Sequence, residues 1–346
     1  MRTRSAEGRP GFTLVEMLVT LAIITILMGL LLTGLRAARG TARDGTQLSN
    51  VRQLFVAWTL YANQNQDACM PGFMDAQVQA TWKLKYKNQS GQNLDPALCQ
   101  TYTWRLLPFY AYSTDVTLGY MTDVDPDINT TLYTEPIRGY TLPAELSTAS
   151  TLPGSAAAIA PAFGYNAYYL GGWWTTQSGA PSMAFEDAKD PTGGNGVRVV
   201  ARTIGAVSRP SDMVAFASSA LSDPGTFKGT EELAIGAAWV VPPWLGTQQV
   251  WSIGQAVQQT LSVPGQPTSL FAPEPAPVMQ AQGDVGAITV YAAQAVPLRR
   301  YAQVVECTVD GGAKTTSYAE LSDMRFWTNR TDLKNAQRFD PVHTPN

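Results

Sequence analysis

One carboxylate stands out in this sequence because of its surroundings. Glu16 is the only charged residue in an apolar run from Phe12 to Leu35. A charge within a bilayer costs on the order of 3 kcal/mol, so an intramembrane carboxylate indicates a function and a partner of opposite charge. At about 1.5 Å per helical residue the run is long enough to cross a bilayer with some tilt. We therefore expect a single-pass membrane helix that carries one ion-pairing group.

The residues on either side of this run limit what it can be. Before it, three arginines face only Glu7, and Pro10 and Gly11 interrupt any helix. An ordinary secretory signal has a shorter apolar core and a small-residue cleavage site after it, which LRAARG at residues 35–40 does not provide. A plain membrane anchor explains the length of the run but leaves the carboxylate unexplained.

A third interpretation accounts for both features. The residues RPGFTLVEM at positions 9–17 resemble the cleavage and methylation signature of type IV prepilins and of type II secretion pseudopilins. The resemblance implies that prepilin peptidase cuts after Gly11 and that the new N-terminal residue, Phe12, is N-methylated. It also implies a role in subunit assembly for Glu16, which would pair with the amine of a neighbouring subunit. Such a pair relieves the cost of burying either charge.

The resemblance implies a structural subunit, a pilin or pseudopilin, of a type IV pilus-like or type II secretion filament, with no enzymatic activity. The implied partners are other pilin or pseudopilin subunits, prepilin peptidase and the membrane. The implied location is the inner membrane, with a globular domain in the periplasm or, after assembly, at the cell surface. The alternative is a membrane-tethered binding or hydrolytic domain that uses a pilin-like anchor. The net charge of −3 argues against a nucleic-acid partner.

A second, looser resemblance covers later segments of the chain. Trp104–Pro108, Gly164–Asn166 and Arg209–Ser211 occur in the order in which large pilin-like proteins of planctomycetes carry similar segments. Asp310–Ala313 resembles part of their terminal hairpin, but Val309 stands where a histidine is expected.

The membrane helix is expected to continue to about residue 65 as an amphipathic helix. We expect a leader at 1–11, an assembly helix at 12–35, its amphipathic continuation at 36–65 and a β-rich extracytoplasmic domain at 66–346. The helix should pack on this domain through apolar residues at helical spacing. These residues are Leu48, Val51, Leu54, Phe55, Trp58 and Tyr61.

The pattern beyond residue 66 is strand-like and rich in loops. It predicts an α+β fold in which the long helix lies on an antiparallel β-sheet domain with loop insertions. The expected elements are a helix or turn at 103–110, strands at 197–207, 212–220 and 287–296, a hairpin of 302–309 with 314–320, a last strand at 324–327, and loops at 147–161 and 264–277.

The remaining reactive residues offer few sites. Cys69 and Cys99 can close a disulfide in an oxidising compartment, or all three cysteines, with Cys307, are small buried apolar residues. A single histidine, His343, excludes a histidine-rich metal centre and leaves a catalytic relay only if the tail folds back.

Two clusters of residues can be interpreted either as binding sites or as ordinary structural features. The alternating Asp123, Asp125 and Asp127 can present oxygens to calcium, but the pattern is no EF-hand, and a solvated acidic loop is favoured. We therefore expect no metal and no other cofactor. Trp173-Trp174, with Tyr168 and Tyr169 nearby, can form a sugar-stacking or partner-binding surface, but burial in the core is the expectation. The sequence predicts no catalytic residue.

Overall fold

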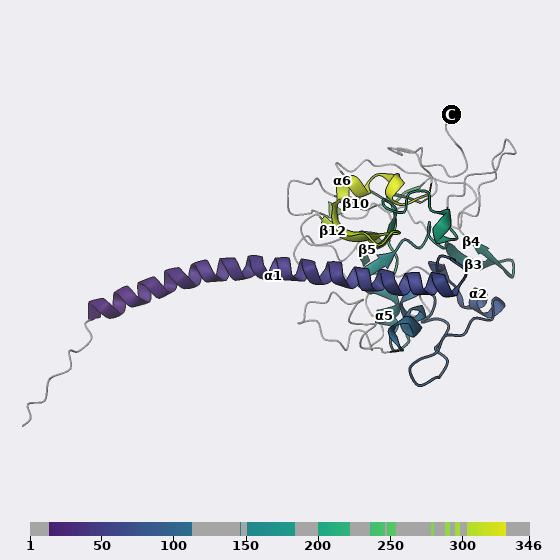
Figure 1. The fold of residues 1–346 in the computed structure, drawn as a ribbon, viewed down its shortest axis with the longest axis horizontal. Coiled ribbons are helices and arrows are strands. Elements are labelled where there is room, and N and C mark those ends of the chain that lie inside the picture. Colours follow the sequence, from purple (N-terminus) through teal and green to yellow (C-terminus); the bar gives the residue numbers. More distant parts are fainter. Residues whose placement is uncertain are drawn as a thin grey trace, which may run out of the picture. The chain divides into compact units, whose positions relative to one another are not determined.

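The computed structural model describes residues 14–112, 146, 151–183, 200–221, 236–245, 248–253, 278–279, 288–290, 295–297 and 303–329. The chain divides into two compact units, Met1–Gln47 and Leu48–Asn346. Helix α1 (Leu14–Gln64) supplies the described part of the first unit and the first element of the second (Figure 1). The long N-terminal helix expected from the sequence is confirmed.

Helix α1 begins and ends for recognisable local reasons. No proline interrupts its 51 residues, and Glu16 lies in the first turn, where a negative charge complements the helix dipole. At the other end Gln66 and Asp67 adopt positive φ angles of 56° and 65°. The Asp67 amide then donates to the carbonyl oxygen of Ala62 at 2.9 Å, which satisfies one of the last helical acceptors.

The second unit is built mainly from antiparallel sheets. In its largest sheet, strand β5 (Val214–Leu221) pairs antiparallel with β12, β2 and β11, and β12 forms a hairpin with β13. A smaller sheet has the order β1-β3-β4, in which β1 and β3 are parallel. The other strands form β8-β10-β9 and β6-β7. Together with α1 these sheets confirm the predicted α+β class.

The remaining elements of the second unit are short. The strands are β1 (Phe73–Met74), β2 (Phe163–Tyr165), β3 (Trp173–Gln177), β4 (Ala180–Met183), β6 (Trp244–Leu245), β7 (Gln248–Gln249), β8 (Trp251–Ile253), β9 (Val278–Met279), β10 (Ile288–Val290), β11 (Ala295–Pro297), β12 (Gln303–Thr308) and β13 (Ala313–Ser317). The helices are α2 (Ala76–Thr81), α3 (Tyr102–Arg105), η1 (Leu107–Tyr110), α5 (Ser155–Ile159), η5 (Ile204–Ala206), α6 (Tyr318–Leu321) and η7 (Met324–Phe326).

The apolar stripe of α1 lies in the core of the second unit, as the spacing predicts. Val51, Leu54 and Trp58 are fully buried, and the other members of the stripe, Leu48, Phe55 and Tyr61, pack against the same core. The Trp58 ring lies against Tyr165 and Phe216, with ring centroids 6.2 and 6.5 Å away. The indole Nε1 donates to the Tyr165 hydroxyl at 3.1 Å. The helix is therefore an integral part of this core.

Two of the predicted strands are wrong in part. The described residues 200–207 form isolated bridges, Leu170 with Ala201 and Ala68 with Thr203, and then the 3₁₀ helix η5. Their β-branched residues fit an extended chain, but no neighbouring strand runs beside them long enough to make a ladder. The single strand predicted at 287–296 is two strands, β10 and β11, which belong to different sheets.

The predicted hairpin of β12 and β13 is confirmed, but the elements after it differ from the prediction. Strand β13 stops at Ser317 because Ser317 and Glu320 form a capping box that starts α6. The expected last strand at 324–327 is the 3₁₀ helix η7, capped by Asp323, whose carboxylate accepts from the Arg325 amide. The loop predicted at 147–161 contains α5, and the one at 264–277 lies outside the described residues.

Candidate functional site

The N-terminal part of α1 is apolar and exposed on all its faces. Residues Leu14–Leu32 form a segment of 19 residues with a mean hydropathy of 2.5, none of it buried within the chain. Leu14 is 80 % exposed and Leu31 is 69 % exposed. A helix that is apolar all round is suited to a nonpolar surrounding, and by length and composition this one can cross a membrane.

The polar side chains of this segment are few, and two of them bond to the helix itself. The Thr20 hydroxyl donates to the carbonyl oxygen of Met17 at 2.9 Å, and the Thr25 hydroxyl donates to that of Ala22 at 2.8 Å. Internal bonds of this kind remove the need for water, which a bilayer core cannot supply. Glu16 is therefore the only ionisable group of Leu14–Leu32, and it is exposed in the first turn.

The predicted processing residues lie just before the described helix. Gly11 and Phe12 are outside the described residues, and α1 begins at Leu14. Cleavage after Gly11 and methylation of Phe12 stay predictions, as does the role of Glu16 in assembly.

The later part of α1 is held by polar contacts as well as by burial. The Tyr110 hydroxyl donates to the carbonyl oxygen of Gln53 at 3.3 Å, and Arg52 donates to that of Ala313 at 3.4 Å. The β12–β13 turn approaches the helix closely at Gly311, whose φ is +90°. A Cβ there would lie 2.8 Å from Phe55 Cε1, so glycine is required on both counts.

The three cysteines do not form a reactive site. Cys69, Cys99 and Cys307 are free and buried, so the bridge considered from the sequence is not formed in this structure. Burial raises the pKa of each thiol to about 12, which leaves these thiols protonated and unreactive at neutral pH.

The remaining metal and catalytic candidates are not described by the structure. Asp123, Asp125 and Asp127 lie outside the described residues, as does His343. Among the residues that are described, no group of three or more His, Cys, Asp or Glu side chains is placed to hold a metal ion.

The aromatic cluster divides between the core and the surface. Trp173, Tyr168 and Tyr169 are buried, with Trp173 stacked on Tyr168 at 4.7 Å between ring centroids. Trp174 is only partly buried and packs edge-on against Trp82, with ring centroids 5.0 Å apart. Burial is therefore confirmed for most of the cluster, and the surface interpretation is left with Trp174 alone.

Sequence reasoning missed two groups of residues in the second unit. Arg105 is buried and donates to four backbone carbonyl oxygens, from Pro71, Gly72, Gln100 and Thr101, at 2.6 to 3.3 Å. This guanidinium ties α3 to two loops.

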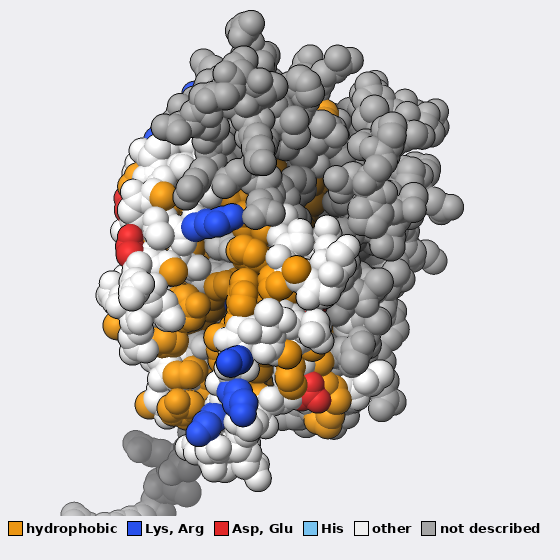
Figure 2. Space-filling view, turned by 90° about the vertical axis from the view of Figure 1, so that its right-hand side faces the viewer, with side chains coloured by type: hydrophobic (Ala, Val, Ile, Leu, Met, Phe, Trp, Pro, Cys, Tyr) orange, Lys and Arg blue, Asp and Glu red, His pale blue; other side chains and the backbone are white. Residues whose placement is uncertain are grey.

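The second group is a basic and aromatic surface around Trp82. Figure 2 shows basic side chains gathered beside a band of hydrophobic side chains on one face of the second unit. The signal in the sequence was WKLKYK at residues 82–87, which holds three of the seven lysines of the chain.

Comparison with known proteins bears on the N-terminal segment alone. Residues 8–32 match the family model described as the prokaryotic N-terminal methylation motif. No curated protein and no solved structure matches the chain. The likeness to large planctomycete proteins therefore stays a prediction. The matched residues include Gly11, Phe12 and Glu16 and run to the end of the exposed apolar segment. The chain thus carries the N-terminal methylation signature of type IV pilins and pseudopilins.

Proposed function

We propose that this chain is a structural subunit of a type IV pilus-like or type II secretion filament. One observation carries the proposal: the methylation motif leads into the helical segment Leu14–Leu32, which is apolar on all faces and has Glu16 as its only ionisable residue. A plain anchor gains nothing from a carboxylate at this depth. A bundle of such helices gains a charge that pairs with a neighbour.

The proposed mechanism follows from the charges of the N-terminal segment. The chain enters the inner membrane with its basic leader inside, and prepilin peptidase cleaves between Gly11 and Phe12. Cleavage creates an amine at the edge of the apolar helix, and methylation of Phe12 leaves it charged. Glu16 of one subunit then pairs with this amine on the next. Removing one partner leaves the other charge unpaired in a nonpolar environment. The pair therefore fixes the axial register between neighbouring subunits.

Gly29 supports assembly through this helix. A Cβ built on Gly29 meets nothing within 4 Å, so no contact within the chain requires glycine at this position. Glycine in a helix costs about 1 kcal/mol relative to alanine. Small residues in membrane helices permit close approach of a second helix, and that contact would offset the cost.

The proposal gives the chain no catalytic role and places its second unit outside the cytoplasm. Two observations support this part of the proposal: the sequence holds a single histidine, and the cysteine thiols are buried with raised pKa values. The second unit would present its surface on the filament.

Replacing Glu16 by alanine tests the proposal. Glu16→Ala should still insert and lose its leader, but its incorporation into filaments should fall roughly a hundredfold, because stranding a buried charge costs about 3 kcal/mol. Thr20→Ala is the matched control, since the Thr20 hydroxyl bonds only to its own helix in the structure. Filament incorporation and leader cleavage are measured in the same cells. Normal incorporation of the Glu16 variant would contradict the proposal.

A further inference from the structure

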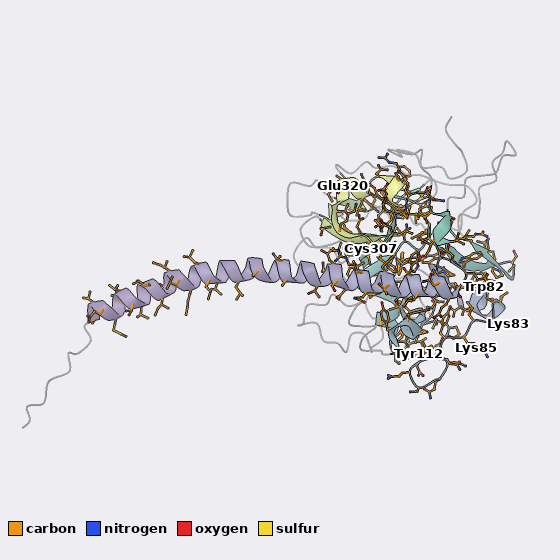
Figure 3. The ribbon with its side chains drawn as sticks, viewed as in Figure 1. Trp82, Lys83, Lys85, Tyr112, Cys307 and Glu320 are labelled. Atoms are coloured by element: carbon orange, nitrogen blue, oxygen red, sulfur yellow. The ribbon has the colours of Figure 1, made fainter. Side chains whose placement is uncertain are left out.

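The surface around Trp82 combines exposed lysines with exposed apolar side chains, a composition suited to binding an anionic polymer. Trp82 is 36 % exposed and Leu84 is 38 % exposed, and Lys83, Lys85 and Lys87 are exposed beside them. Figure 3 shows Trp82, Lys83 and Lys85 together at one end of the second unit, away from Glu320. We call these five residues, Trp82–Lys85 and Lys87, the Trp82 surface.

The backbone that carries the Trp82 surface is fixed. Asp75 caps α2 by accepting from the Val78 amide and from the Thr176 hydroxyl of β3, at 2.6 and 3.0 Å. Helix α2 ends at Thr81 with Trp82 as its C-cap, after which Lys83 adopts a positive φ of 57° and the Leu84 amide donates to the Gln79 carbonyl at 2.9 Å. The direction of the Trp82 ring is therefore set by the end of α2.

The lysines are held in place by a short hairpin-like loop. The Leu94 amide donates to the Tyr86 carbonyl at 2.8 Å, and Lys87 forms an isolated bridge with Asn93. The Tyr86 side chain packs against the core, whereas Lys85 and Lys87 on either side of it are exposed. This alternation along an extended segment directs both lysines outward. Because the backbone of the loop is already ordered, it loses little conformational entropy when a ligand binds to its lysines.

The stretch that carries this surface has basic residues only, although Asp75 and the exposed Asp95 border it. The sequence has no Asp or Glu between Ala76 and Leu94, and β3 and β4, which pack on α2, contain none. A further cation, Arg202, lies 5.8 Å over the Trp174 ring. In the part of the chain that the structure describes, no ion pair involves the three lysines. They form a basic region on a protein whose net charge is −3.

The aromatic part of the surface offers one open ring. Trp174 meets Trp82 edge-on at 73°, and the Trp174 indole donates to the Gly171 carbonyl at 2.8 Å, so Trp174 is fixed as a backing for Trp82. A single supported ring beside exposed Leu84 fits the apolar face of a sugar. The lysines around it fit carboxylate or sulfate groups on the same polymer.

We propose that the Trp82 surface binds an anionic polysaccharide. A nucleic acid is the less favoured occupant, because it carries a charge on every nucleotide and the protein has no basic excess overall. The inference goes beyond filament assembly and does not depend on it, since the surface lies wholly within the second unit.

The test uses the full-length chain in detergent and two polymers. Polygalacturonate should bind, and neutral dextran should not. Trp82→Ala should weaken binding about tenfold, as for a central aromatic contact. Replacing Lys83, Lys85 and Lys87 together by glutamate should weaken it by more than that and remove its salt dependence. Tyr112→Ala and Arg52→Gln are matched controls, since Tyr112 is 39 % exposed and Arg52 is exposed on α1.

The alternatives give distinct results. Tighter binding of an oligothymidylate than of polygalacturonate would overturn the proposal in favour of a nucleic-acid surface. Binding that survives both substitutions would also overturn it, and so would no binding of polygalacturonate by the unchanged protein. Circular dichroism of each variant shows whether a loss of binding comes from unfolding; if Trp82→Ala unfolds, the lysine variant decides. None of these outcomes depends on whether the Glu16 variant assembles.

Discussion

The two ends of α1 belong to one helix but place the same kinds of side chain in opposite situations. In Leu14–Leu32 the large apolar residues are exposed on every face, whereas between Leu48 and Gln64 one apolar stripe is buried and the other face is largely polar. The sequence pattern differs accordingly, being apolar all round in the first part and one-sided in the second. One continuous helix can therefore suit two environments. Its later part packs in the core of the second unit, and its N-terminal part needs a nonpolar environment outside the chain.

The largest effect on the packed part should come from its central aromatic residue. Trp58→Ala should lower the free energy of unfolding of the second unit by about 4 kcal/mol, since it opens a cavity. It also leaves the Tyr165 hydroxyl without its indole donor. Denaturant unfolding of the full-length chain in detergent, followed by Trp fluorescence, measures the change.

The matched control for this substitution lies on the exposed face of the same helix. Val56 is 51 % exposed, so Val56→Ala should change the free energy of unfolding by less than about 0.5 kcal/mol. Equal losses for Trp58→Ala and Val56→Ala would show that the stripe is not what holds the helix.

Two glycines, one against the packed part of α1 and one in its exposed apolar part, should respond differently to substitution by alanine. Gly311→Ala should destabilise the second unit by about 2 kcal/mol, because it strains a positive φ and pushes a Cβ against Phe55. Gly29→Ala should leave the stability of the second unit unchanged, because its added Cβ meets open space. Unfolding midpoints of the two variants, measured side by side, check the difference. A tolerated Gly311→Ala would contradict the close approach of the turn to α1.

The smallest effect concerns pH and the buried Glu306. Burial raises the pKa of Glu306 above its ordinary 4.5, although hydrogen bonds from Thr316 and Lys314 oppose the shift. A raised pKa means that the charged form destabilises the fold at neutral pH, and that stability is regained as the pH falls through the folded-state pKa. Glu306→Gln should therefore be more stable than the unchanged protein at pH 7, by about 1 kcal/mol or less, and this advantage should shrink as the pH falls through the raised pKa and be lost near pH 4.5.

Asp310 provides a control of opposite sign. Hydrogen bonds from Thr308 and Gly312 lower the pKa of Asp310, so its charge stabilises the fold above 3.8 and that contribution is lost as the pH falls. Asp310→Asn should be slightly less stable at neutral pH, and its deficit should shrink in acid. Unfolding midpoints of both variants across the acid range measure the signs. A deficit for Glu306→Gln at neutral pH that disappears in acid would mean that its Lys314 ion pair outweighs burial.

What could be predicted from the sequence followed from patterns that one element carries by itself. The apolar stripe from Leu48 to Tyr61 predicted the packed face of α1, and the Asp-Gly-Gly turn at 310–312 predicted the β12–β13 hairpin. The capping box of Ser317 and Glu320 is also a local pattern. It was missed because the strand pattern before it was extended to residue 320.

What could not be predicted depended on partners distant in the chain. Residues 200–207 look like a strand, yet whether they make one is decided by neighbours near residues 68 and 170. Trp173 and Trp174 are adjacent and alike, but successive residues of β3 face opposite ways, so one is buried and the other reaches the surface. The Trp82 surface needed both α2 and β3 before its residues could be seen together.

In the proposed function, processing removes the leader, and the apolar end of α1 then serves in assembly. The most direct test is the intact mass and N-terminal sequence of the protein extracted from its native membrane. We expect a chain that begins at N-methylated Phe12. A mature chain that begins at Met1 would contradict it and would leave the helix as an unprocessed anchor.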